Sequence, residues 1–208
     1  IWGVAGAAAE AEALAAMVSF MESVGLTSDD VGIKVNSRAV LAELLARTCG
    51  VGAAADAARF AACCVLVDKL EKVPPEALHG DFGALGVAAA DVDALAAVLR
   101  DAADAGGSLA ALEALIGDGP ALSNLRALVD LAEAGGFGDW IVVDASVVRG
   151  LAYYTGVVFE AFDRQGALRA IAGGGRYDRR LETFRGAPRH AAGSRATRTS
   201  TWATSSCT

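Results

Sequence analysis

Residues 148–162 read VRGLAYYTGVVFEAF, and residues 172–178 read AGGGRYD. In both stretches glycine stands beside arginine and tyrosine at the end of an expected strand. Glycine lets a ligand approach the backbone closely, and arginine offers a planar fork of donors for a phosphate or carboxylate group. Tyrosine adds a flat apolar face with one hydroxyl group for a directional hydrogen bond. The two stretches therefore predict a site for a small molecule that has both an anionic group and a ring.

These stretches lie in the part of the chain that is richest in expected strands. Apolar residues alternate along residues 141–148, and β-rich runs follow at 157–162 and 167–172. Short turns separate these runs, which predicts antiparallel strands, and residues 31–36 predict one more strand nearer the N-terminus. The glycine run 173–175 is expected to end the last of these strands and to precede a short helix.

Most of the remaining chain is expected to be helical, because apolar residues recur at three- and four-residue steps. Ser37 is a suitable N-cap for a helix that ends near Gly50, and Gly25 is a suitable C-cap for the helix before it. Proline and glycine pairs break the alanine-rich middle of the chain into separate helices. The expected helices span residues 7–25, 38–50, 54–72, 91–105, 108–116 and 121–134.

The composition limits the class of protein. The chain has 208 residues, a hydrophobic content of 54% and a net charge of −7, which is consistent with one domain or one domain with a small second unit. The acidic balance argues against a strong stand-alone nucleic-acid binder. No apolar run approaches the roughly 20 residues that span a bilayer, so we expect no membrane contact. No secretory signal is visible, because Glu10 and Glu12 interrupt the N-terminal segment, and we expect a cytoplasmic location, with an organellar one as the alternative.

Common nucleotide and metal motifs are absent from the sequence. Asp178 stands where a dinucleotide fingerprint would have its third glycine, and there is no GxxxxGK phosphate loop. His79 and Asp81 are expected on a surface loop, and the aspartates near position 100 are expected to form a solvated face rather than a metal site. The cysteines lack CxxC spacing and predict reduced thiols. They are Cys49, Cys63, Cys64 and Cys207.

The two stretches together resemble the two histidine-specific signatures of histidyl-tRNA synthetases. The first signature usually reads RGLDYYTG followed by an apolar strand and glutamate, and AGGGRYD resembles the second. Flanking segments add to the likeness. Residues 1–12 resemble the stretch after the second class II motif, and residues 33–38 and 67–73 resemble the insertion region, most closely that of eukaryotic members. The resemblance covers about residues 1–184.

The resemblance implies an α+β fold. It would contain part of the antiparallel β-sheet of a class II synthetase catalytic core, together with an α-helical insertion that reaches toward the tRNA acceptor stem. Residues 1–50 and 137–184 would belong to the core, and residues 51–136 would form the insertion. Residues 185–208 would be an irregular basic tail, either a disordered segment that meets RNA or an acidic partner, or the product of a slipped reading frame.

The resemblance also implies a histidine–tRNA ligase that uses ATP and Mg²⁺. Histidine and ATP would form histidyl adenylate, and histidine tRNA would accept the acyl group. Family members are homodimers, but the class II motif of the dimer interface would precede Ile1, and so would the second class II motif. We therefore expect this chain alone to be an inactive fragment.

Carried over residue by residue, the resemblance places the histidine site in the two signatures. Arg149 matches the arginine that contacts the α-phosphate and the histidine carboxylate, so it would be the catalytic residue that stabilises developing negative charge. Tyr153 and Tyr154 match the tyrosine pair at the amino-acid pocket, and Tyr177 matches the tyrosine that reads the imidazole. The pocket floor would be formed by Gly173, Gly174 and Gly175.

Departures from the family pattern keep other interpretations open. Ala152 replaces an aspartate of the first signature, and Arg179 stands where many members have glycine. Ala152 suits a non-catalytic histidine-binding paralogue, such as the regulatory subunit of ATP phosphoribosyltransferase. If there is no site, Arg149 would pair with Asp144 or Glu160, and the tyrosines would be ordinary strand residues. A degenerate gene product without function is the third interpretation.

Overall fold

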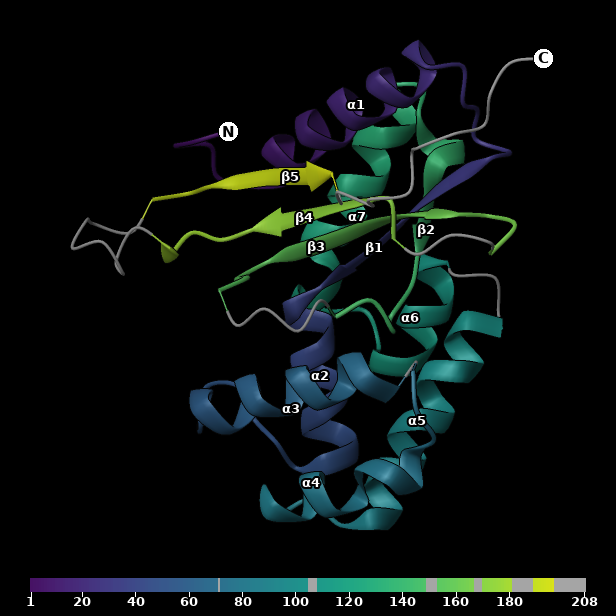
Figure 1. Ribbon diagram of the computed structural model, residues 1–208. Coiled ribbons are helices and arrows are strands. Elements are labelled where there is room, and N and C mark those ends of the chain that lie inside the picture. Colours follow the sequence, from purple (N-terminus) through teal and green to yellow (C-terminus); the bar gives the residue numbers. More distant parts are fainter. Residues whose placement is uncertain (71, 105–107, 149–152, 167–169, 181–188, 197–208) are drawn as a thin grey trace.

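The computed structural model describes residues 1–70, 72–104, 108–148, 153–166, 170–180 and 189–196 (Figure 1). These residues form a five-stranded sheet that is associated with helices, which confirms the expected α+β fold. The order of the strands across the sheet is β2-β1-β3-β4-β5. The strands are β1 (Val31–Ser37), β2 (Ile141–Val143), β3 (Val157–Asp163), β4 (Ala172–Arg176) and β5 (Ala192–Ala196).

Antiparallel pairing joins β1, β3, β4 and β5. The sequence predicts antiparallel strands at 157–162 and 167–172, near β3 and β4, but it does not predict β5. Lys34 of β1 lies opposite Glu160 of β3, and Glu160 in turn lies opposite Gly173 of β4. The prediction of an antiparallel strand over residues 141–148 is wrong, because β2 has three residues and pairs in parallel with β1. The helical part of the chain separates these two strands, and such a long crossover permits parallel pairing.

The apolar alternation that follows β2 reflects burial rather than a strand. Asp144 turns the chain, since its Oδ1 accepts hydrogen bonds from the backbone N–H and the hydroxyl of Ser146 at 2.9 and 2.6 Å. The amide of Asn36 then donates to the carbonyl oxygens of Ala145 and Val147 at 2.9 and 3.0 Å. A side chain of β1 therefore satisfies carbonyl groups that a strand ladder would otherwise pair.

Glycine-rich and tail residues contribute strands that the sequence does not predict. The run 173–175 lies inside β4 instead of ending the strand before it. The expectation of an irregular tail is wrong for residues 192–196, which pair with β4 along their whole length. An available sheet edge orders this segment although it lacks an apolar alternation, because strand formation depends strongly on context. Residues 167–169, 185–188 and 197–208 lie outside the described residues.

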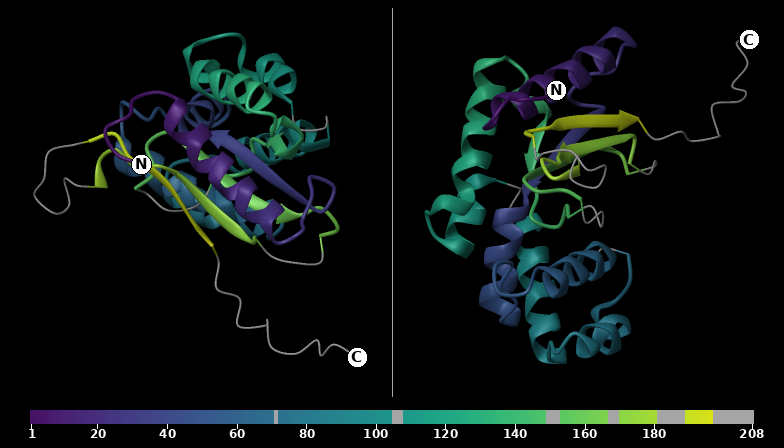
Figure 2. Two further views of the ribbon diagram at one scale, coloured as in Figure 1. Left: turned by 90° about the horizontal axis from the view of Figure 1, so that it is seen from above. Right: turned by 90° about the vertical axis from the view of Figure 1, so that its left-hand side faces the viewer.

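Two helices cover one face of the sheet (Figure 2). α1 (Ala8–Ser23) packs against α7 (Pro120–Ala134) and β5, and α7 also packs against β1. Buried residues of the two helices, such as Leu14 and Leu128, share one apolar core with Phe159 of β3. The expected insertion therefore includes one helix, α7, that packs on the sheet.

The other helices form a lobe at one end of the sheet (Figure 1). They are α2 (Arg38–Cys49), α3 (Ala57–Leu70), the short 3₁₀ helix η1 (Pro75–Leu78), α4 (His79–Ala84), α5 (Ala89–Asp104) and α6 (Leu109–Ile116). The Ser37 hydroxyl accepts a hydrogen bond from the backbone N–H of Ala39 at 3.2 Å, which confirms the predicted N-cap of α2. The lobe interior is apolar and includes Phe82 and Leu95, and a second 3₁₀ helix, η2 (Gly138–Trp140), precedes β2.

The predicted thiols and metal ligands are also placed by the structure. Cys49, Cys63 and Cys64 are buried free thiols, as predicted, and Cys207 lies outside the described residues. His79 begins α4, so its expected position on a loop is wrong, because η1 continues directly into that helix. The described residues contain no group of three or more potential metal ligands. None of the described helices combines the length and apolarity needed to cross a membrane.

Candidate functional site

Three tyrosines meet where β3 begins and β4 ends. Pairing of Val158 with Gly175 brings the residues just before β3 beside those just after β4. The ring centroids of Tyr153 and Tyr154 are 4.6 Å apart, and the ring of Tyr177 lies edge-on to that of Tyr153 at 6.3 Å. The structure therefore brings the tyrosines of both signatures into one cluster.

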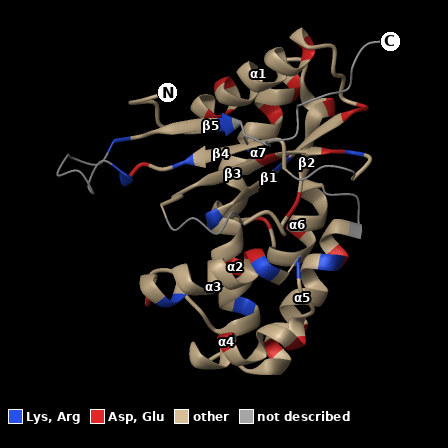
Figure 3. Ribbon diagram, in the orientation of Figure 1, with Lys and Arg blue, Asp and Glu red and all other residues tan. Residues whose placement is uncertain are grey.

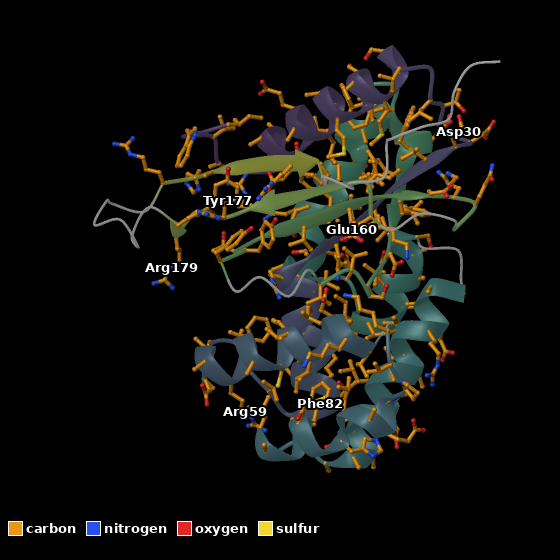
Figure 4. All side chains as sticks on the ribbon, viewed as in Figure 1. Asp30, Arg59, Phe82, Glu160, Tyr177 and Arg179 are labelled. Carbon is orange, nitrogen blue, oxygen red and sulfur yellow. The ribbon has the colours of Figure 1, made fainter. Side chains whose placement is uncertain are left out.

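The tyrosine cluster is partly open to solvent. Tyr154 is buried against Val158, whereas Tyr153 and Tyr177 are only partly buried. The guanidinium carbon of Arg180 lies 4.6 Å from the centre of the Tyr153 ring, within the range of a cation–π contact. Figure 4 shows Tyr177 and Arg179 at the same end of the sheet. Aromatic faces and positive charge therefore occur together here.

The glycines of β4 allow unusually close approach of their neighbours. A Cβ atom at Gly174 would collide with the carbonyl oxygen of Gly193 and lie 2.6 Å from the Phe159 ring. A Cβ atom at Gly175 would lie 2.9 Å from the Tyr154 ring. Because these positions have no side chain, β4 can pack closely against β3, β5 and the Tyr154 ring. Their role as a pocket floor stays a prediction.

A cavity of about 400 Å³ lies between the tyrosines and α3. This volume is in the range of small-molecule sites. The described lining residues are Arg38, Ala57, Phe60, Ala61, Cys64, Tyr153, Tyr154, Thr155, Arg179 and Arg180. This described lining is aromatic, apolar and cationic, and it includes no carboxylate, no residue of the glycine run and no Tyr177. The cavity therefore suits a ligand that has an apolar or ring portion and an anionic group.

Figure 3 shows positively charged residues at the end of β4 and at the start of β5. One of these cations, Arg176, is buried and forms an ion pair with Glu10 of α1, with Nη2 2.6 Å from Oε2. This ion pair was not predicted from the sequence. A usable signal exists, because Glu10 shares one face of α1 with the buried residues Leu14, Met17 and Met21. A charged residue on an apolar helix face predicts a buried partner.

Residues 149–152 lie outside the described residues, so the position of Arg149 relative to Tyr177 stays a prediction. One alternative partner of Arg149, Asp144, forms an ion pair with Lys34 at 2.8 Å. Burial raises the pKa of Asp144, but hydrogen bonds from Lys34 and from neighbouring hydroxyl and backbone donors outweigh it, and the pKa lies below its ordinary value of 3.8. Asp144 is therefore a carboxylate at neutral pH with a partner of its own.

Sequence comparison points to one family. The chain matches the family model described as histidyl-tRNA synthetase over residues 1–197. It is 46% identical over 187 residues to the chloroplastic/mitochondrial histidine–tRNA ligase of Arabidopsis thaliana, and the match covers 89% of this chain. The chain spans 36% of the length of that relative.

Solved structures show the same fold. The histidyl-tRNA synthetase of Nostoc sp. has a TM-score of 0.71 at 21% identity, and the match covers 93% of this chain and 45% of that one. A Bacillus halodurans protein described as an ATP phosphoribosyltransferase regulatory subunit/histidyl-tRNA synthetase has a TM-score of 0.69 at 23% identity, with 93% and 48% covered. The sheet and its helices therefore have the fold of a class II synthetase core.

Proposed function

Because this chain belongs to the histidyl-tRNA synthetase family, we propose that it supplies the histidine-binding side of a histidine–tRNA ligase active site. One observation carries the proposal. Tyrosines from both signatures form one cluster beside a cavity that arginines line. Ring faces and hydroxyl groups suit an imidazole, and guanidinium groups suit a phosphate or carboxylate.

The proposed reaction has two steps. A carboxylate oxygen of histidine attacks the α-phosphorus of ATP, the bond to the β-phosphate breaks, and pyrophosphate leaves. A terminal ribose hydroxyl of histidine tRNA then attacks the acyl carbon of histidyl adenylate, AMP leaves, and the hydroxyl proton is released. Both steps increase negative charge near the reacting atoms, which a positioned cation stabilises.

We assign the residues of the two signatures to the substrate groups that take part in these steps. Arg149 would hold the α-phosphate and the histidine carboxylate. Tyr153 and Tyr154 would bound the amino-acid pocket, and Tyr177 would form a hydrogen bond with the imidazole. A site built to pair both ring nitrogens rejects side chains that lack them, because its own polar groups would then stay buried without partners.

Mg²⁺ would enter with ATP rather than occupy a site made by the described residues. Mg²⁺ is commonly held by substrate phosphates together with one or two carboxylates. The described lining of the cavity offers arginines and no carboxylate. The described lining therefore does not fit a protein-held Mg²⁺, and we assign it no metal-dependent step.

Histidine-dependent exchange of pyrophosphate into ATP tests the proposal in the full-length protein that carries this chain. We expect Arg149→Ala to lower kcat by about 100-fold or more, because it removes a cation that acts on the transition state. Arg126→Ala is the matched control, since Arg126 of α7 forms half-exposed ion pairs with Glu113 and Asp118. Unchanged exchange in Arg149→Ala would contradict the role of Arg149. No histidine-dependent exchange in the unmodified protein would contradict the proposed activity.

A non-catalytic histidine-binding protein is the second candidate. Ala152 in the first signature favours it, and the Bacillus halodurans protein with the same fold carries both descriptions. Titration calorimetry separates the two candidates, because a regulatory protein binds histidine without consuming ATP. Release of pyrophosphate on mixing with histidine and ATP would exclude this candidate.

We extend the proposal to assembly and location. The family implies a homodimer, and light scattering of the full-length protein measures its mass. The family interpretation implies a cytoplasmic location, whereas similarity to a chloroplastic/mitochondrial enzyme supports an organellar one. Imaging of a fluorescent fusion of the full-length protein distinguishes the two locations.

A further inference from the structure

We propose that Glu10, Arg176 and Asp178 form a clamp that positions Tyr177 to read the imidazole of histidine. This inference rests on the proposed function of the site. The clamp residues are positioning residues, because they would act on the ligand only through Tyr177. Arg176 and Asp178 flank Tyr177 in the chain, whereas Glu10 lies in α1, 166 positions before Arg176.

Every donor of the Arg176 guanidinium is engaged within the protein. Nε and Nη2 donate to the two carboxylate oxygens of Glu10 at 2.7 and 2.6 Å. Nη2 also donates to the carbonyl of Gly6 at 2.6 Å, and Nη1 donates to the carbonyl of Val4 at 3.2 Å and to Asp178 at 3.1 Å. A guanidinium has five N–H donors, so none is left for a phosphate. The arginine of the second signature is therefore an anchor rather than a ligand-binding group.

The central pair of the clamp is shielded from water. The side chains of Glu10 and Arg176 are 2% and 8% exposed. Hydrogen bonds to Glu10 raise the pKa of Arg176, which keeps the guanidinium charged. Bidentate contact fixes the plane of the guanidinium as well as its position. Arg176 is therefore held in one orientation at the end of β4.

Asp178 ties the residues around Tyr177 to two other segments. Its Oδ1 accepts a hydrogen bond from the backbone N–H of Ala191 at 2.8 Å, in addition to the one from Arg176. Its own backbone N–H donates to the hydroxyl of Thr155 at 3.1 Å. The backbone N–H of Tyr177 donates to the carbonyl of Ala191 at 2.8 Å. The chain is thus fixed on both sides of Tyr177.

The Tyr177 side chain occupies a position that several neighbours define. Its ring lies edge-on to Trp2 and to Tyr153, with centroid distances of 6.3 Å in both cases. Its hydroxyl lies over Gly193, where a Cβ atom would be only 2.8 Å away. A hydroxyl that selects by hydrogen bonding needs such a defined position, because small displacements weaken directional bonds. The clamp accounts for that position.

Kinetics of pyrophosphate exchange in the full-length protein test the clamp. Glu10→Gln keeps the size of the side chain but replaces one acceptor oxygen with a donor that faces Arg176. We expect the KM for histidine to rise about tenfold, because a small misplacement of the Tyr177 hydroxyl weakens its binding to histidine. The KM for ATP should stay nearly unchanged. The matched control is Glu12→Gln, an exposed residue of the same helix. A purely structural role would lower the fraction of active enzyme and so kcat, without changing either KM.

The ring contact of Trp2 with Tyr177 gives a second measurement that does not depend on activity. Proton NMR of this chain should show a nuclear Overhauser effect between the two rings, which is lost in Glu10→Gln and kept in Glu12→Gln. A retained ring contact together with an unchanged KM for histidine would overturn the clamp. If the unmodified protein lacks histidine-dependent exchange, the proposed function fails, and the ring contact alone still decides whether the clamp positions Tyr177.

Discussion

The site end of the sheet and the helical lobe are stabilised in different ways. At the site end, a buried ion pair joins Glu10 to Arg176, and Gly174 allows β4 to fit closely between its neighbours. In the lobe, apolar side chains fill the interior, and ion pairs lie near the surface, such as that of Lys72 with Asp68 four positions earlier. A substitution at the site end should therefore cost more stability than a similar substitution in the lobe.

The largest expected difference comes from removing one member of an ion pair in each region. Arg176→Ala leaves the Glu10 carboxylate buried without its partner, and we expect it to lower the free energy of unfolding by about 3–5 kcal/mol. Lys72→Ala removes an exposed cation, and we expect a loss below about 1 kcal/mol. Urea unfolding followed by circular dichroism measures both values. Equal losses would remove the distinction between the two regions.

Glycine substitutions should shift stability in opposite directions in the two regions. Gly174→Ala forces a Cβ atom against β5 and the Phe159 ring, and we expect a loss of about 1–3 kcal/mol. Gly80 lies in α4 with no atom within 4 Å of the added Cβ, so Gly80→Ala should raise stability by up to about 1 kcal/mol. Thermal unfolding reports both shifts. A stabilising Gly174→Ala would show that β4 has room for a side chain.

Lowering the pH should destabilise the folded chain, because Asp144 beside the sheet becomes protonated. Its pKa is lower in the folded chain than its ordinary value of 3.8, so the unfolded chain binds the proton more tightly. The stability contribution of Asp144 is therefore present above about pH 4 and is lost as pH falls through the folded pKa. Asp144→Asn should flatten this part of the stability profile, and Asp101→Asn, on an exposed position of α5, is the control. An equally steep profile in Asp144→Asn would refute this assignment.

The smallest expected effect concerns the thiols of the lobe. Burial raises the pKa of Cys63 to about 11, so its thiol stays protonated at pH 8. Iodoacetamide should therefore leave Cys63 unmodified in the folded chain and modify it in urea, as peptide mass spectrometry would show. Rapid modification of the folded chain would mean that the lobe opens readily and that Cys63 is not shielded by the apolar interior of the lobe.

Much of the fold follows from local sequence patterns. Ser37 and Gly50 delimit α2 as predicted, because capping interactions act within one helical turn. The alternation of apolar residues predicts β1, since neighbouring side chains of a strand point to opposite faces, and a β-rich run predicts β3. Along residues 145–148 apolar residues also alternate, but the predicted strand does not form. These residues are buried without the backbone hydrogen bonds of a paired strand.

Less of the site follows from such patterns. The tyrosines of the two signatures are close together because they flank paired strands, which the sequence analysis anticipates. The placement of Arg149 stays a prediction, because it lies outside the described residues. The cavity wall formed by α3 has no counterpart in the sequence analysis, because α3 meets the site only through the fold.

The sequence by itself determined where the described α-helices other than α4 lie, which residues of the signatures stand near strand ends, and to which family the chain is similar. Only the tertiary structure decided that Arg176 is an anchor, that the glycine run lies within a strand, and that the chain near the C-terminus completes the sheet. The physical reason is the separation along the sequence of the residues that interact. Local patterns record interactions over a few residues, whereas Glu10 and Arg176 are 166 positions apart, and the role of a cation depends on which carboxylate packs against it.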